Sequence, residues 1–110
     1  MRLALSTVLA LAICSHPVVG GERGIASRYC QLTKTASGRT VSCRDLVAAH
    51  RRLPFGKRVK VTNLSNGKSV IVTIVDRGPF VRGRIIDLSQ GAASRIGSAG
   101  LMRVELTLEW

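Results

Sequence analysis

Two acidic residues follow apolar runs at a spacing that could bring both carboxylates to one surface. Asp76 ends the β-branched run 70–75 and is followed by Arg77 in a Gly-Pro turn, and Asp87 follows a pair of isoleucines in the same way. Strands that end in acids can place those acids side by side, and a pair of carboxylates is typical of sites that cleave glycans. We therefore interpret Asp76 and Asp87 as a candidate site for cleaving or binding a glycan.

The strands that must position these acids are visible in the hydrophobic pattern. Residues 58–64 and 70–75 are predicted to be two strands joined by the turn Asn66-Gly67, the strongest hairpin signal in the chain. The second strand is apolar on both faces, as expected for a central strand. Strict alternation over residues 102–110 predicts a further strand with one face in the core.

Two short helices are predicted among these strands. Residues 89–96 can form one, with their small apolar side chains facing inward and Gly97 ending the helix. A second is predicted over residues 44–49. Several short strands, two helical segments and eleven glycines indicate an all-β fold, a small closed barrel.

The N-terminal residues are typical of an export signal and not of a folded element. Arg2 precedes the apolar run 3–13, and small residues at 17–21 offer a cleavage site. The run is too short to span a bilayer, and it lacks the amphipathic period of a buried helix. We therefore predict a signal peptide over residues 1–21 and a mature domain over residues 22–110. The mature domain is expected to be exported, and periplasmic or associated with the cell wall.

Cys14 leaves a second processing route open. The segment Leu11-Ala12-Ile13-Cys14 resembles a lipoprotein signal, in which the cysteine is lipid-modified, although Ile13 stands where such signals have a small residue. We expect membrane anchoring only if Cys14 is lipidated.

Removal of the signal leaves two cysteines, Cys30 and Cys43, in the mature domain. In an oxidising compartment they can pair, and closing a loop of this length is worth about 3 kcal/mol in the chain-entropy model. Two unpaired buried thiols are the alternative. A zinc site would need four ligands, and His50 is the only histidine left to join the cysteines, so we expect no metal and no cofactor.

Charge limits the range of partners. Seventeen Lys and Arg against six Asp and Glu give a net charge of +11, or about +10 once Arg2 is removed with the signal. Such a surface attracts polyanions. No aromatic residue sits in a nucleic-acid-binding motif, so we expect no nucleic acid partner. An exported domain instead meets wall glycan, anionic lipid or lipopolysaccharide, while cations spread only for solubility are the alternative.

Seven short motifs occur in the order found in one known family, from Ala26 to the C-terminus. They are Thr35-Ala36-Ser37-Gly38, Ala48-Ala49-His50-Arg51, Leu53-Pro54-Phe55-Gly56, Val61-Thr62-Asn63, Asn66-Gly67, Asp76-Arg77-Gly78-Pro79-Phe80 and Ile86-Asp87-Leu88-Ser89. On these motifs the chain resembles rare lipoprotein A (RlpA), a family of septal-ring lytic transglycosylases related to the barrel domain of expansins.

The resemblance implies a six-stranded double-psi β-barrel with one or two short helices and a groove for a carbohydrate strand. It also implies an endolytic transglycosylase, a lyase of cell wall biogenesis that acts on peptidoglycan strands lacking stem peptides. We expect the protein to be a monomer. In the transglycosylase reaction the sugar's own 6-hydroxyl attacks the anomeric carbon and leaves a 1,6-anhydromuramyl end. One acid that then serves as base can suffice. The stripped strand exposes lactyl carboxylates, which a basic groove would fit.

The resemblance also points to particular site residues. Asp76 and His50 match positions assigned to the site, and Asp87 lies where expansin barrels place an acid, so these three are the candidate catalytic residues. A turn-forming Asp76, a packed His50 and a helix-capping Asp87 are the alternatives. The candidate substrate-binding residues are Arg77, Thr35, Ser37 and Arg51.

The chain departs from the family after the Thr-Ala-Ser-Gly motif. Active members carry Glu directly after it and Asp three residues later, where this chain has Arg39 and Ser42. A guanidinium that never loses its proton cannot replace an acid that delivers one, although Asp45 is a nearby substitute. A transglycosylase working through Asp76 and a barrel that binds wall glycan without cutting it therefore both stay open. A cationic effector of anionic membranes is a third hypothesis, and only the charge supports it.

A second departure is Cys30, which stands where the family often has glycine. Together with Cys43 it suggests a disulfide that joins the first strand to the altered segment.

Overall fold

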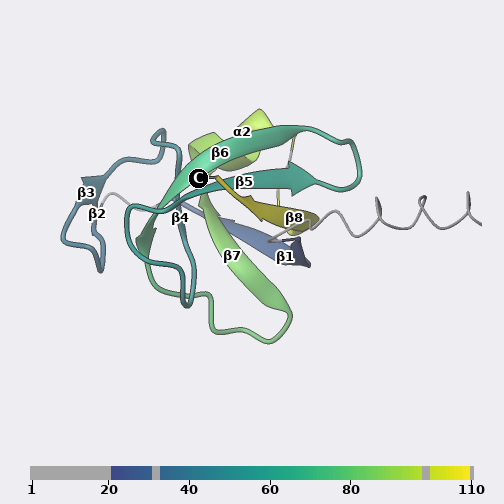
Figure 1. Cartoon of the computed structure of the whole chain (residues 1–110). Coiled ribbons are helices and arrows are strands. Elements are labelled where there is room, and N and C mark those ends of the chain that lie inside the picture. The colour runs from purple at the N-terminus through teal and green to yellow at the C-terminus, as the bar shows by residue number, and fades with distance from the viewer. Residues whose placement is uncertain (1–20, 31–32, 98–99, 110) are drawn as a thin grey trace, which may run out of the picture.

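The structure is a computed structural model that describes residues 21–30, 33–97 and 100–109. The predicted signal peptide, apart from Gly21, lies outside the described residues, and so does Cys14. The strands are β1 (Glu22–Tyr29), β2 (Thr33–Lys34), β3 (Thr40–Val41), β4 (Val47–Ala49), β5 (Arg58–Asn63), β6 (Ser69–Asp76), β7 (Arg84–Ser89) and β8 (Met102–Leu108). Figure 1 shows the hairpin of β2 and β3 beside the other six strands, which close into a barrel.

The barrel order is β1-β7-β4-β6-β5-β8, with β8 pairing back to β1. Two pairs run parallel, β1 with β7 and β4 with β6, and the other neighbours are antiparallel. This closed six-stranded barrel confirms the predicted fold class. The strand predicted to be central, β6, is paired on both sides, with β4 and with β5.

The barrel interior is filled by alternate side chains of the strands. Val59 and Val61 of β5 are fully buried, as are Val72 and Ile74 of β6. β-branched residues suit a pleated strand whose inner face is covered. The turn between β5 and β6 contains Gly67 at φ +77°, a conformation that L side chains rarely adopt. The predicted hairpin is therefore confirmed.

One helix, α2 (Gln90–Arg95), is seated against the barrel. The Ser89 hydroxyl accepts a hydrogen bond from Ala92 N–H at 3.1 Å and caps its first turn. Ala92 and Ala93 are buried, and Gly97 follows at φ +75°. The helix predicted over residues 89–96 is thus confirmed. Within the described residues, no helix has the length and apolar character to cross a membrane.

The second predicted helix, over residues 44–49, is wrong. Residues 47–49 form β4, which pairs with β6 on one side and β7 on the other. All three side chains are buried. Backbone hydrogen bonds from two neighbouring strands outweigh the helical preference of an alanine pair.

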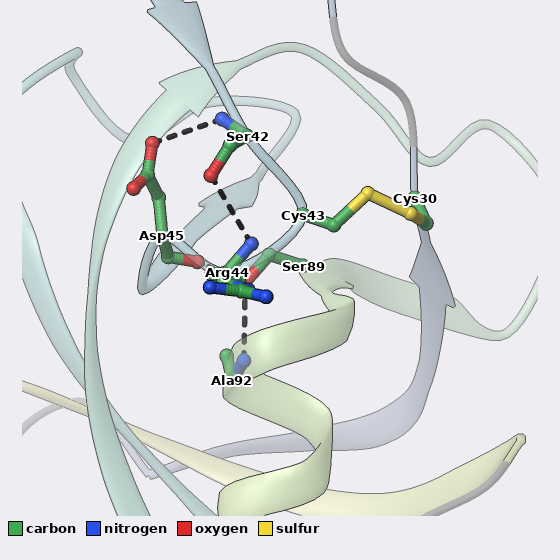
Figure 2. The surroundings of a disulfide bond; sticks show 7 residues. All are labelled: Cys30, Ser42, Cys43, Arg44, Asp45, Ser89 and Ala92. Atoms are coloured by element: carbon green, nitrogen blue, oxygen red, sulfur yellow. Dashed lines mark hydrogen bonds between the residues drawn. A yellow bond between two sulfur atoms is a disulfide. The ribbon is translucent and has the colours of Figure 1, made fainter.

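The loop before β4 is fixed at several points, as Figure 2 shows. A disulfide joins Cys43 to Cys30, which directly follows β1. Gly91 N–H donates to the Cys43 carbonyl at 2.8 Å, and the Ser89 hydroxyl donates to the Asp45 carbonyl. The disulfide and these hydrogen bonds therefore connect the loop to the end of β1 and to the start of α2.

Candidate functional site

The two acids come together because both are register partners of one small residue. Ala49 of β4 pairs with Asp76 of β6 on one side and with Asp87 of β7 on the other. Neighbouring strands lie about 4.8 Å apart, so the backbones of the two acids are about 10 Å apart across Ala49. Ala49 has only a methyl group, which leaves space between the carboxylates.

That space is a pocket of about 150 Å³, lined by Tyr29, Ala49, Asp76, Arg77 and Asp87. We call it the acid pocket. It is too small for a drug-sized ligand, which needs about 300 Å³ or more. The pocket can therefore take one group of a larger molecule, whose remainder must lie across the open surface.

Asp76 is anchored through one oxygen. Its Oδ1 accepts hydrogen bonds from Ala36 N–H at 2.9 Å and from Arg77 N–H at 3.0 Å. In the described part of the chain, Oδ2 has no hydrogen-bond partner. The side chain is half-buried. One oxygen thus fixes the orientation of the carboxylate, and the other is available to a ligand.

Asp87 is held by Ser27 of β1, whose hydroxyl donates to Asp87 Oδ1. The two residues are register partners in the parallel pair of β1 and β7. Ser27 is buried. Sequence reasoning did not single out Ser27, because its role appears only once β1 is aligned with β7.

Tyr29 is the site residue that sequence reasoning missed. It lines the acid pocket, and its buried hydroxyl has no hydrogen-bond partner among the described residues. Burial, and then the charges of Asp76 and Asp87, raise the pKa of Tyr29 from 10.0 to about 12. Tyr29 lies two residues after Ser27 on the same face of β1, and the pairing of β1 with β7 is what brings both residues to the site.

Arg77 forms one wall of the acid pocket. Its Nη1 donates to the carbonyls of His50 and Leu53 at 3.1 and 2.8 Å. The guanidinium carbon lies 4.0 Å from the centre of the Phe55 ring, a cation–π contact. These contacts tie the loop after β4 to the pocket, so Arg77 combines a structural role with a positive charge at the site.

His50 does not line the acid pocket. Its Nδ1 accepts N–H bonds from Arg52 and Leu53 at 3.0 and 3.1 Å, so the ring proton lies on Nε2. Nε2 is 3.2 Å from Glu22 Oε1, and the ring is buried. The backbone N–H of His50 donates to the Asp76 carbonyl at 3.2 Å. His50 therefore contacts the site through its backbone.

Thr35 and Ser37 build the turn that presents Ala36 to Asp76. The Thr35 hydroxyl donates to the Arg39 carbonyl at 2.8 Å and lies 2.9 Å from the Ser37 hydroxyl. Ser37 N–H donates to the Val75 carbonyl at 3.1 Å, directly before Asp76. Neither side chain lines the acid pocket.

The residues that depart from the family pattern lie outside the acid pocket. Arg39 is exposed, and so is Arg51, the fourth predicted substrate-binding residue. Ser42 N–H donates to Asp45 Oδ2 at 2.9 Å, so the Asp45 carboxylate holds its own loop (Figure 2). Asp45 is not brought to the other two acids. Among the described residues, no group of His, Cys, Asp and Glu is arranged to hold a metal ion.

A family model described as lytic transglycolase matches residues 21–106. This chain belongs to that family. Its fold is the double-psi β-barrel of RlpA-like proteins, as the seven motifs implied. An expansin from Clavibacter michiganensis superposes with a TM-score of 0.64 at 21% identity, covering 80% of this chain and 50% of the expansin. That likeness concerns the fold alone.

Relatives named as transglycosylases match most of the chain. A protein of Synechocystis described as a probable endolytic peptidoglycan transglycosylase RlpA is 56% identical over 90 residues, which is 77% of this chain. The endolytic peptidoglycan transglycosylase RlpA of Pasteurella multocida is 52% identical over 90 residues, or 76% of this chain. The matched segments span only 28% and 31% of those two proteins.

Proposed function

We propose that this lytic transglycolase-family domain is an endolytic transglycosylase that cleaves peptidoglycan strands lacking stem peptides. The observation that carries the proposal is the convergence of Asp76 and Asp87 on one pocket, across Ala49. Two relatives named as endolytic peptidoglycan transglycosylases support the substrate class. The positive charge of the chain suits a stripped strand, because that strand exposes a carboxylate on each muramic acid.

In the proposed reaction Asp76 acts first as the acid. Its proton passes to the glycosidic oxygen while the bond from that oxygen to the anomeric carbon breaks. The resulting carboxylate then takes the proton of the 6-hydroxyl as this oxygen bonds to the anomeric carbon. No water is consumed, and Asp76 is again protonated at the end. The free Oδ2 supports this role, since Oδ1 is already occupied.

The neighbouring residues take supporting roles in this proposal. The Asp87 carboxylate stabilises the positive charge that develops at the sugar ring. His50 acts as a positioning residue, because its backbone N–H holds the end of β6. Arg77 and the exposed Arg51 supply charge for lactyl carboxylates. Thr35 and Ser37 contribute by fixing the turn around Ala36.

We also propose that the domain acts after export, as a monomer in the periplasm at the septal ring. The apolar run 3–13 supports a signal peptide over residues 1–21. The disulfide between Cys30 and Cys43 supports an oxidising compartment. Anchoring to a membrane is expected only if Cys14 is lipidated.

The test is to incubate the protein with glycan strands whose stem peptides have been removed, and with intact strands. We expect 1,6-anhydromuramyl ends from the stripped strands only, detected by mass spectrometry. Asp76→Asn is expected to slow their formation by about a hundredfold or more, because it removes a general acid. Asp45→Asn is the matched control, since that carboxylate lies outside the acid pocket and should leave the rate near that of the wild type.

Two outcomes would contradict the proposal. Strands that bind without yielding any anhydro end at high protein concentration would identify a non-catalytic glycan-binding barrel. Reducing ends without the anhydro bridge would identify a hydrolase, in which water replaces the 6-hydroxyl.

A further inference from the structure

A larger hollow of about 670 Å³ lies on the outer wall of the barrel, away from the acid pocket. It is lined by three cations, by one serine and by three apolar residues: Arg58, Lys60 and Arg95, Ser69, and Leu46, Val70 and Ile71. We call it the cationic groove. It shares no lining residue with the acid pocket. Ile71 and Asp76 are five residues apart on β6, which is about 16 Å along a strand.

The strand pattern and the helix together bring three cations to this groove. Because Val59 and Val61 fill the core, Arg58 and Lys60 project from the outer face of β5. Arg95 lies in the last turn of α2, which packs beside β6 (Figure 1). All three side chains are exposed.

No carboxylate neutralises these cations from within the groove. The ion pairs of Arg23 with Glu105 and of His50 with Glu22 do not involve the groove. Glu109 follows β8 beside Arg58, since its N–H donates to the Arg58 carbonyl, but it does not line the groove. The nearby Asp45 carboxylate accepts a bond from Ser42 N–H.

The number of donors favours phosphate over carboxylate. Two arginines present planar forks of N–H groups, and Lys60 adds an ammonium. A carboxylate has only two oxygens to offer, whereas a tetrahedral phosphate can accept hydrogen bonds from several directions and from more than one arginine. A groove with three cations therefore matches phosphate groups better than single carboxylates.

The lining of the groove favours a polymer over a lipid surface. Proteins that bind membranes through cations commonly insert apolar side chains as well. The apolar residues of the groove do not protrude, because Val70 is buried and Leu46 and Ile71 are half-buried. The exposed large hydrophobic residues lie outside the groove; they are Phe55, Leu64, Phe80, Val81 and Leu101. We infer that the cationic groove binds phosphate groups of a linear anionic polymer, at a site separate from the acid pocket. This inference does not rest on the proposed transglycosylase activity.

The test compares the wild type with two triple variants of the full chain that lose the same charge. Binding to end-labelled inorganic polyphosphate is measured by fluorescence anisotropy over a range of salt concentrations. The groove variant lacks the three groove cations and carries Arg58→Gln, Lys60→Gln and Arg95→Gln. The control variant lacks two arginines and a lysine that line neither the groove nor the acid pocket, and it carries Arg44→Gln, Lys68→Gln and Arg82→Gln. Circular dichroism and thermal unfolding check that both variants are folded.

We expect the groove variant to bind polyphosphate about tenfold or more weakly than the wild type, with a shallower dependence on salt, because fewer counterions are released. The control variant should lose much less affinity. Poly-L-glutamate of equal length should bind more weakly than polyphosphate. Binding of the protein to vesicles of anionic phospholipid should be the same for the wild type and the groove variant.

Other results would overturn the inference. Equal losses in both variants would mean that binding follows overall charge. Equally tight, groove-dependent binding of poly-L-glutamate would remove the assignment to phosphate. Groove-dependent binding to vesicles, or no binding of polyphosphate by the wild type, would remove the assignment to a polymer.

Discussion

The two acids of the pocket are oriented by different hydrogen-bond donors. Asp76 is oriented by the backbone of Ala36, which belongs to a turn forty residues earlier in the chain. Asp87 is oriented by the hydroxyl of Ser27. The two carboxylates therefore sit in different surroundings although both end β-branched runs. Different surroundings are what a site needs when two acids take different roles.

Tyr29 offers a test of this pocket through its unpaired hydroxyl. Tyr29→Phe is expected to leave the fold intact and to raise the free energy of unfolding at pH 7 by up to about 1 kcal/mol, because a buried hydroxyl without a partner is removed. Urea unfolding of both proteins measures this difference. A large loss of stability would show that the hydroxyl has a partner in solution.

The pKa of Tyr29 also predicts how the stability of the wild type and of Tyr29→Phe depends on pH. Burial and the two carboxylates raise this pKa from 10.0 to about 12, so the folded protein holds the proton more tightly than the unfolded chain. The contribution of Tyr29 to stability is therefore complete below pH 10 and is lost as the pH rises towards 12. The wild type should lose more stability over this range than Tyr29→Phe. Parallel curves would contradict the raised pKa.

Arg39 and Ser42 allow a direct test of where the acid lies. Because neither lines the acid pocket, the double change Arg39→Glu and Ser42→Asp is expected to leave the rate of anhydro product formation near that of the wild type. Arg82→Glu with Ser94→Asp makes the same change of charge elsewhere on the surface, where both residues are exposed, and serves as control. A general acid contributes about a hundredfold or more. A gain of that size in the first variant alone would show that Asp76 does not supply the proton.

At the scale of the elements, the sequence alone predicted a strand or helix correctly where one residue pattern dominates. Alternation predicted β8, the Asn66-Gly67 turn predicted the hairpin of β5 and β6, and small apolar residues followed by a glycine stop predicted α2. β4 was wrongly predicted to be helical. Its alanine pair favours a helix, and its three residues become a strand only because they pair with β6 and β7. For the same reason the sequence could suggest that Asp76 and Asp87 converge, but it could not reveal Ala49 between them or Tyr29 beside them.

The disulfide is expected to stabilise the barrel by restricting the unfolded chain. The two cysteines are 13 residues apart in the sequence. Replacing both by alanine should lower the free energy of unfolding by about 3 kcal/mol in the chain-entropy model. Urea unfolding measures the loss, and the wild type under reducing conditions should show a loss of similar size. An unchanged stability in both cases would mean that the contacts around the loop suffice without the bond.

Gly91 tests how closely α2 is seated on the loop before β4. A Cβ at this position would lie 2.5 Å from the Arg44 carbonyl oxygen, and that backbone is held by the neighbouring Cys43 and its disulfide. Gly91→Ala should therefore destabilise the fold by about 1 to 3 kcal/mol. Gly100→Ala is the control, because a Cβ there meets no atom within 4 Å. Thermal unfolding compares the two, and equal melting temperatures would contradict the close contact.

At the scale of the whole molecule, the acid pocket depends on the register of four neighbouring strands of the barrel. Its lining residues come from β1, β4, β6 and β7, together with the residue that follows β6. A one-residue slip of β7 would turn Asp87 to the other face of the sheet. The surface charge, in contrast, needs no particular register. The proposed attraction to an anionic wall and the proposed chemistry at the pocket therefore rest on different features of the domain and can be tested separately.

This separation predicts how the protein binds wall sacculi stripped of stem peptides. Asp76→Asn should sediment with sacculi as well as the wild type does, because it removes only the proton that the proposed reaction needs and leaves the cations in place. Binding of both proteins should weaken as salt rises from about 0.05 to 0.5 M, since screening shortens the reach of exposed charges. A fraction that stays bound at high salt would come from contacts in and around the acid pocket. If all binding disappears at high salt, charge alone holds the protein on the sacculi. If Asp76→Asn no longer sediments, Asp76 is needed for binding, which would contradict a purely catalytic role.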